Sequence, residues 1–249
     1  MAYTIDFWQI VAMGEAKPQF QSFSRYAYHD GLGGAEVFVS PGSQAIAPYM
    51  PNGLFTVEVV SSSIEDGAGK TGALAVRLYG LDNDFKEINV LAYMAGTAVV
   101  AIPTQFRRLT YAEVEQVGAY GGSNVGNITV RLPSAGATLF IIPIGFGRSA
   151  SSHMVVPAGE TWYIHEVRVV TDIGGKRTVS LWARPKADVT ASPFTPAQLV
   201  SRVKGPSFGY DLQLRAVPKI MQEKTDLWVT AWGTTGDTVS IALGILRVK

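Results

Sequence analysis

Short stretches in which hydrophobic and polar residues alternate recur along the chain, and Gly, Pro, Asn and Asp separate them. In residues 54–61 the alternation places Phe55, Val57 and Val59 on one face, because successive side chains of a strand point to opposite sides. This stretch is therefore predicted to be a half-buried strand. The same pattern predicts strands over residues 74–81, 86–91, 98–102, 107–115, 127–132, 138–143, 153–156, 161–171, 177–184, 210–216, 226–232 and 238–247.

Two local signals refine this pattern. Asp82-Asn83-Asp84-Phe85 separates two predicted strands, and Asp and Asn bond to their own backbone and tolerate positive φ, so a hairpin turn is predicted there. Residues 195–203 differ from the rest. Pro196 suits the first turn of a helix and Thr195 suits its N-cap, so these residues predict a short helix.

Many short strands joined by tight turns predict an all-β fold, namely an antiparallel, jelly-roll-like β-sandwich. Gly-rich and Ser-rich stretches at residues 118–126 and 145–152 interrupt the strands, which suggests a boundary near residues 134–150. A single large sandwich is the alternative. The predicted organisation is an extended N-terminal arm over residues 1–35, a β-sandwich domain over residues 36–135 and a second β-sandwich domain over residues 136–249.

The first 35 residues carry aromatic side chains without regular alternation, and glycines interrupt them. Large aromatic side chains often dominate the energetics of protein interfaces. One interpretation is an arm that docks on a neighbouring subunit, and the other is an arm folded back over the chain's own core. The candidate interface residues are Phe7, Trp8, Phe20, Phe23, Tyr26 and Tyr28.

The composition narrows the class of protein. Hydrophobic residues make up 47% of the chain and charged residues 16%, which excludes disorder. The 21 basic and 20 acidic side chains nearly cancel, so there is no electrostatic footprint for nucleic acid or an anionic membrane. A weakly charged chain near neutrality tends to associate. We therefore expect protein partners and a homo-oligomer, with a trimer as one option.

The residue spacing of the candidate catalytic and metal-binding segments does not match that of known motifs. Gly67-Ala68-Gly69-Lys70-Thr71 ends like a phosphate-binding loop, but Ile64 stands where that motif needs a glycine, and a predicted strand follows instead of a helix. His29, His153 and His165 show no metal-ligand spacing, and the absence of cysteine excludes thiolate sites. We therefore expect no enzymatic activity, no cofactor and no metal site.

Two further sets of residues allow a binding role. Tryptophans that were exposed could form a stacking platform for a carbohydrate, although core packing is the favoured interpretation because all of them lie in predicted strands. These are Trp162, Trp182, Trp228 and Trp232. The basic residues form no dense run, so they are interpreted as rim contacts of a protein interface and not as part of a nucleic-acid groove. These are Arg107, Arg108, Lys204, Arg215 and Lys219.

Several segments resemble a family of accessory virion structural proteins of tailed bacteriophages from marine and freshwater genomes. The resemblance covers residues 55–171, extends less closely to residues 23–39, and departs at residues 144–147, where the family is more polar. The segments that carry it are Val-Glu-Val-Val-Ser-Ser-Ser at 57–63, Gly-Lys-Thr-Gly-Ala-Leu-Ala-Val-Arg-Leu-Tyr-Gly-Leu-Asp at 69–82, Gly-Gly-Ser-Asn-Val-Gly-Asn-Ile-Thr-Val at 121–130, Ile-Pro-Ile-Gly-Phe-Gly-Arg at 142–148 and Val-Pro-Ala-Gly-Glu-Thr at 156–161.

The resemblance implies a virion component on or near the capsid or tail, with no catalytic residues. The expected function is a capsid-associated subunit of the decoration or cement type, and its expected partners are other virion proteins. The alternative is a tail or vertex protein that binds host-surface carbohydrate. The start of the chain, Met1-Ala2-Tyr3-Thr4-Ile5-Asp6, lacks a basic segment leading into an apolar one, so we expect synthesis in the host cytoplasm without export.

Overall fold

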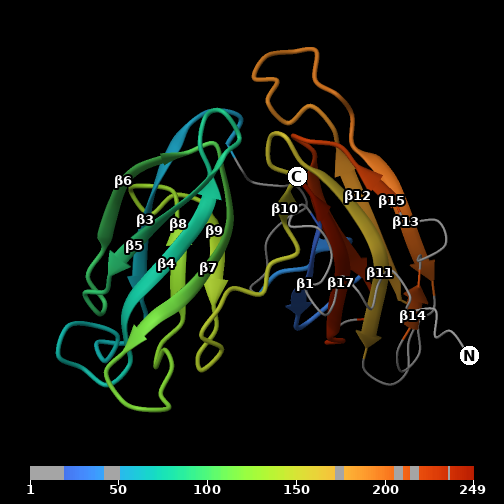
Figure 1. The fold of residues 1–249 in the computed structure, drawn as a ribbon. Helices are drawn as coiled ribbons and strands as arrows, with labels where there is room; N and C mark the ends of the chain where they lie inside the picture. Colours follow the sequence, from blue (N-terminus) through green and yellow to red (C-terminus); the bar gives the residue numbers. More distant parts are fainter. Residues whose placement is uncertain (1–19, 42–50, 172–176, 205–209, 214–218, 235) are drawn as a thin grey trace, which may run out of the picture.

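The computed structural model describes residues 20–41, 51–171, 177–204, 210–213, 219–234 and 236–249, and every regular element in these ranges is a β-strand (Figure 1). The all-β prediction is confirmed, with antiparallel sheets packed as sandwiches. No helix in the described part of the chain is long and apolar enough to cross a membrane.

The first sandwich consists of a four-stranded and a three-stranded sheet that share one hydrophobic core. Phe106 and Phe140 are completely buried there, and burying such a side chain contributes about 1.5–3 kcal/mol. The first sheet has the order β6 (Val100–Phe106), β3 (Phe55–Ser61), β8 (Ile128–Arg131), β9 (Thr138–Ile142), and the second has the order β5 (Glu87–Tyr93), β4 (Ala73–Leu81), β7 (Arg108–Val117).

The second sandwich consists of two sheets around a separate core. One sheet has the order β1 (Phe20–His29), β17 (Val239–Val248), β11 (Thr161–Thr171), β14 (Tyr210–Gln213), and β15 (Lys219–Met221) also pairs with β11. The other has the order β10 (Met154–Val155), β16 (Asp226–Trp232), β12 (Thr178–Arg184), β13 (Gln198–Lys204), and β2 (Val37–Phe38) also pairs with β16.

Strand β1 is part of the second sandwich, although it lies within the predicted arm. It pairs with β17 in an unbroken antiparallel register from Phe20 opposite Val248 to His29 opposite Val239. Its Ala27 is buried in the core. In this part of the chain the structure agrees with the interpretation in which the segment folds back on its own core. Phe7 and Trp8 lie outside the described residues.

The helix predicted over residues 195–203 is wrong. Residues 198–204 form β13, which pairs with β12 from Lys204 opposite Thr178 to Gln198 opposite Ala183. Proline and threonine in the first turn are compatible with a helix, but the propensity of so short a segment is weak, and pairing with the edge of an existing sheet overrides it.

The two cores divide the chain at slightly different places from the predicted boundaries. Leu139, Phe140 and Ile142 pack in the first core although they follow residue 136. Leu32 lies in the second core although it precedes residue 36. The second sandwich therefore contains the first and the last described strands, β1 and β17, which lie side by side in Figure 1. The three predicted domain ranges stay a prediction.

Candidate functional site

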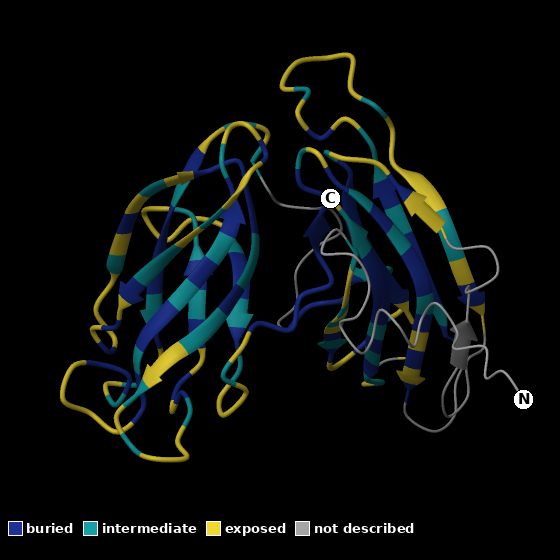
Figure 2. Cartoon of the chain, in the orientation of Figure 1, coloured by how far each residue is buried: buried dark blue, intermediate teal, exposed yellow. Residues whose placement is uncertain are grey.

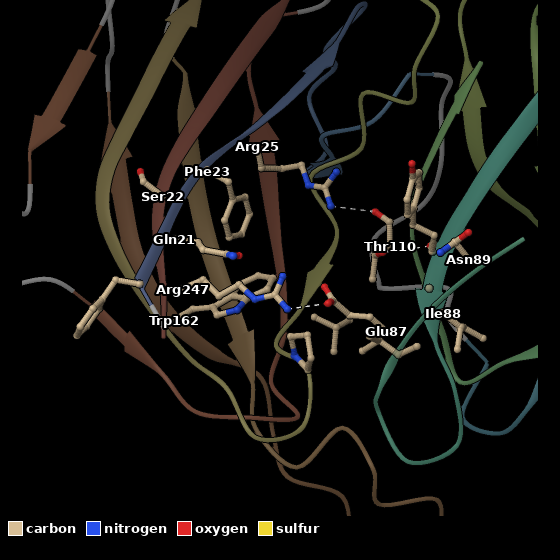
Figure 3. Close-up of a pocket in the computed structure, with 16 residues that line it drawn as sticks. Gln21, Ser22, Phe23, Arg25, Glu87, Ile88, Asn89, Thr110, Trp162 and Arg247 are labelled. Atoms are coloured by element: carbon tan, nitrogen blue, oxygen red, sulfur yellow. Dashed lines mark hydrogen bonds and ion pairs between the residues drawn. The ribbon is translucent and has the colours of Figure 1, made fainter. Parts of the chain in front are cut away.

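A groove of about 690 Å³ separates β1 of the second sandwich from β4 and β5 of the first (Figure 3). Phe20, Gln21 and Phe23 line one side of it, and Glu87 and Asn89 line the other. A second pocket of about 320 Å³ shares several of these residues and continues the groove past Tyr26. Three candidate interface residues, Phe20, Phe23 and Tyr26, thus border one groove within the chain.

The aromatic residues of β1 contact the chain's own side chains. The ring of Phe23 meets Trp162 edge to face, with centroids 5.1 Å apart. Tyr28 stacks on Phe146 at 5.2 Å, and Phe146 follows β9 of the first sandwich. Aromatic pairs in such geometries contribute about 0.5–1.5 kcal/mol beyond the area that they bury. These contacts fix β1 in place, and the proposed role of its aromatics in contacting another subunit stays a prediction.

A positive charge lies inside this groove. The guanidinium of Arg25 donates one hydrogen bond, to the backbone oxygen of Thr110 at 3.3 Å, and lies 4.9 Å from the ring centroid of Tyr111. Its Nε is buried and has no hydrogen-bond partner. Burial, together with the nearby charge of Arg148, lowers the pKa of Arg25 to about 10 although Tyr111 acts in the opposite direction.

Two tyrosines that line this end of the groove, Tyr79 and Tyr111, hold the carboxylate of Glu113. Tyr79 donates to Oε1 of Glu113 at 2.5 Å, and Tyr111 donates to Oε2 at 3.2 Å. Burial and the hydrogen bond to Glu113 raise the pKa of Tyr79 to about 12, so this phenol stays protonated in neutral solution. Glu113 therefore already has two donors.

A buried ion cluster joins the two sandwiches beside the groove. Arg108 of β7 donates from Nε to Oδ1 of Asp226 in β16 at 2.9 Å, and both side chains are fully buried. Arg184 of β12 donates to Oδ2 of the same carboxylate at 2.6 Å, and His153 Nε2 lies 3.8 Å from Oδ1. The interpretation of Arg107 and Arg108 as rim contacts is wrong, because both are buried inside the chain.

Backbone contacts extend this junction. Arg107 donates to the carbonyl oxygens of Asn52 at 2.9 Å and Asp188 at 2.9 Å, and Arg108 donates to that of Ala187 at 2.9 Å. Arg107 and Arg108 therefore both contact the loop after β12. Phe85 is buried in a small cluster with residues of the second sandwich, and its carbonyl accepts from Ala158 N at 2.9 Å.

The charge on Asp226 makes the junction sensitive to acid. Burial alone would raise its pKa, but the neighbouring His153 and the charge and hydrogen bond of Arg108 outweigh burial and hold the pKa far below 3.8. The unfolded chain takes up this proton near pH 4, while the folded chain does not. The stabilisation is therefore complete above about pH 5, and the free energy of unfolding falls as the pH drops further.

Urea denaturation between pH 3 and pH 7 measures this effect. The loss of stability in acid is expected to be smaller in Asp226→Asn than in the parent chain, because the variant has no such carboxylate to protonate. An equal loss in both proteins would assign the acid sensitivity to other groups.

The end of the first sandwich carries loops with exposed apolar side chains. Ile64, Tyr120, Ile144 and Phe146 are each about half to fully exposed. Figure 2 shows the exposed loops of the first sandwich gathered at the lower end of the view. These loops connect β3 to β4, β7 to β8 and β9 to β10.

Buried side chains hold these loops together. Asp66 accepts from the backbone N–H groups of Ala73, Val125 and Gly126, each at 2.8 Å. Asn124 donates to the carbonyl oxygen of Pro143 at 2.7 Å, and its own side-chain oxygen accepts from Gly147 N at 3.0 Å. Apolar side chains are thus presented on loops whose backbone is fixed.

The tryptophans mostly serve packing. Trp162 and Trp228 are buried, and Trp182 donates from Nε1 to Thr230 Oγ1 at 2.9 Å. Trp232 is exposed by 38% and donates to the Gly34 carbonyl at 2.7 Å. The core interpretation is thus confirmed for Trp162 and Trp228. Among the described residues no group of three or more His, Asp or Glu side chains is arranged to hold a metal ion.

No protein-family model matches the chain, and no curated protein matches its sequence. Among solved structures it is weakly similar to the infectious bursal disease virus VP2 subviral particle, with 12% identity over 97% of this chain and 77% of that chain and a TM-score of 0.20. T=1 particles derived from the same virus match at 12% identity over 97% and 74% of the chains, with a TM-score of 0.21. TM-scores of this size do not establish a shared fold.

Proposed function

We propose that the chain is a non-enzymatic virion structural protein of a tailed bacteriophage, a capsid-associated subunit of decoration or cement type that stabilises the particle through subunit contacts. The observation that carries the proposal is the loop end of the first sandwich. Apolar side chains such as Ile64 and Ile144 are exposed there on loops fixed by Asp66 and Asn124. A surface that is already ordered loses little conformational entropy when it binds a partner.

The rigid junction between the sandwiches supports the same proposal. Arg108 and Asp226 link the two cores through buried charges, so the loop end is held in a fixed orientation relative to the second sandwich. In a symmetric particle each copy repeats its contacts, and modest interfaces become strong once one contact is made. The proposed partners are other virion proteins and further copies of the chain, and the proposed location is the virion.

The loop end gives a direct test with matched variants. Ile144→Ser is expected to weaken incorporation into particles by about tenfold or more, because burying an isoleucine side chain at an interface contributes about 1.5–3 kcal/mol. Ile220→Ser is the control, because Ile220 is similarly exposed, at 54% against 58%, but lies on β15 of the second sandwich. The measurement is the copy number of the chain in purified particles by quantitative mass spectrometry.

Both variants should leave stability within about 0.5 kcal/mol, since they change exposed positions. The proposal of a loop-end interface fails if Ile144→Ser is incorporated as well as Ile220→Ser. The virion assignment itself fails if the parent chain is absent from purified particles of the phage that encodes it.

A deletion tests whether the N-terminal aromatics dock on a neighbouring subunit, and it must be shorter than residues 1–35. Removing all 35 residues would delete β1 and expose β17, and would therefore test folding. Deleting residues 2–19 removes Phe7 and Trp8 and retains β1. Particle incorporation is expected to be lost while the thermal unfolding transition is retained, and full incorporation of the deletion variant would contradict an arm that docks on neighbours.

A further inference from the structure

Arg25 has hydrogen-bonding capacity that the described chain does not use. A guanidinium carries five N–H donors, and only the bond to Thr110 O, at 3.3 Å, engages one of them here. No carboxylate of the described residues forms an ion pair with Arg25, and its Nε is buried without a partner. Burying a cation without a counter-ion is unfavourable, so an anionic group that entered the groove would gain by pairing with it.

Arg148 adds a second positive charge at the same place. It lines the groove together with Arg25, is exposed, and forms no ion pair within the described part of the chain. The acidic residue that lines the groove, Glu87, is already engaged, because it pairs with Arg247 at 2.6 Å. Glu113 lies behind the lining residues Tyr79 and Tyr111 and accepts from both of their hydroxyls. The charged groups without an ion-pair partner at this end of the groove are therefore the two arginines, Arg25 and Arg148.

The remaining lining favours a ligand that has both hydroxyl groups and an apolar ring face. Gln21, Asn89 and Thr110 supply amide and hydroxyl groups, and the ring of Phe23 lies between Gln21 and Arg25 on β1 (Figure 3). Sugar rings present this combination of polar edges and an apolar face. A flat carboxylate matches a guanidinium, which can donate two parallel hydrogen bonds to it.

We propose that this groove binds an acidic saccharide, with a uronate carboxylate between Arg25 and Arg148 and the sugar ring against Phe23. The groove thereby gains a carbohydrate-binding role that does not depend on the virion assignment. This site lies between the sandwiches and differs from the alternative of a platform of exposed tryptophans. Trp162 is buried in it and supports the ring of Phe23.

The probe is an oligogalacturonate, titrated into the purified full-length chain by isothermal calorimetry, and the matched ligand is the same oligomer with all carboxylates methyl-esterified. We expect saturable binding of the acidic form and binding about tenfold or more weaker for the ester, because hydrogen bonds to charged groups are the strong ones. Arg148→Gln is expected to weaken binding by a similar factor. Arg202→Gln on β13, which does not line the groove, removes the same charge and should change the affinity less than twofold.

The affinity of Arg25→Gln for the acidic oligomer is a second test of the carboxylate contact. Circular dichroism shows whether this variant is folded. The proposal is overturned if the acidic oligomer does not bind at millimolar concentration, if the ester binds equally well, or if Arg148→Gln binds like the parent chain. Equal binding of poly-glutamate would also overturn it, since charge alone would then be recognised. Because the assay uses the isolated chain, its outcome is independent of whether the chain enters particles.

Discussion

Replacing Asp226 by asparagine is expected to lower the free energy of unfolding by about 3–5 kcal/mol, because it removes one partner of a buried ion pair. Arg108 would keep its charge in a site where it is fully buried, with backbone oxygens as its remaining acceptors. Arg184 would also lose its carboxylate, but it is partly exposed and can turn toward solvent. The loss comes mainly from the uncompensated charge on Arg108.

Urea denaturation at pH 7 measures this loss, and Glu115→Gln is the matched control. Glu115 pairs with Arg77 at 2.8 Å in a partly exposed pair on the first sandwich, where such a bond contributes less than about 1 kcal/mol. A loss for Asp226→Asn no larger than that of the control would show that the junction charges do not stabilise the fold.

The local sequence pattern was sufficient to predict those strands that have one buried and one exposed face. Phe55, Val57 and Val59 face the first core as the alternation predicted, and the turn at residues 82–85 joins β4 to β5. Within that turn Asp82 Oδ1 accepts from two backbone N–H groups, as expected for an Asp that bonds to its own turn. These features depend on residues that are neighbours in the sequence.

Edge strands were harder to predict. β1 pairs with one strand and alternates poorly, because several of its side chains face the groove while others face solvent. β13 is also an edge strand, and most of its side chains are at least partly exposed, so its sequence carries no two-faced signal. In such strands the partner determines the structure and local propensity does not.

The junction could not be predicted, because its parts are far apart in the sequence. Arg108 and Asp226 are separated by 118 positions, and both occur in strands whose pattern is compatible with an exposed polar residue. The consecutive arginines at 107 and 108 were the available signal, but a pair of charges usually indicates a solvated face. The sequence likewise placed aromatics in the first 35 residues without indicating that β1 would form a groove with β4 and β5.

Phe85→Ala is expected to destabilise the chain by about 3–5 kcal/mol, the usual cost of removing a buried phenylalanine from a site that cannot collapse. Phe85 is 1% exposed and packs with Leu81 of its own hairpin and with Val155 and Ala187 of the second sandwich. The guanidinium carbons of Arg107 and Arg108 each lie 5.8 Å from its ring centroid. The cavity would therefore open beside the buried charges and admit water to them.

The matched control is Phe194→Ala, because Phe194 is half-exposed and its truncation should change stability by less than about 0.5 kcal/mol. Hydrogen exchange separates a local cavity from a loosened junction. Two backbone hydrogen bonds report on the two sides of the junction: Arg107 N donates to Leu81 O, and Ala187 N donates to Lys224 O. Faster exchange of both amides in Phe85→Ala would show that the two sandwiches separate at the junction. Unchanged exchange at both positions, with stability equal to that of the control, would mean that Phe85 fills space without joining the two cores.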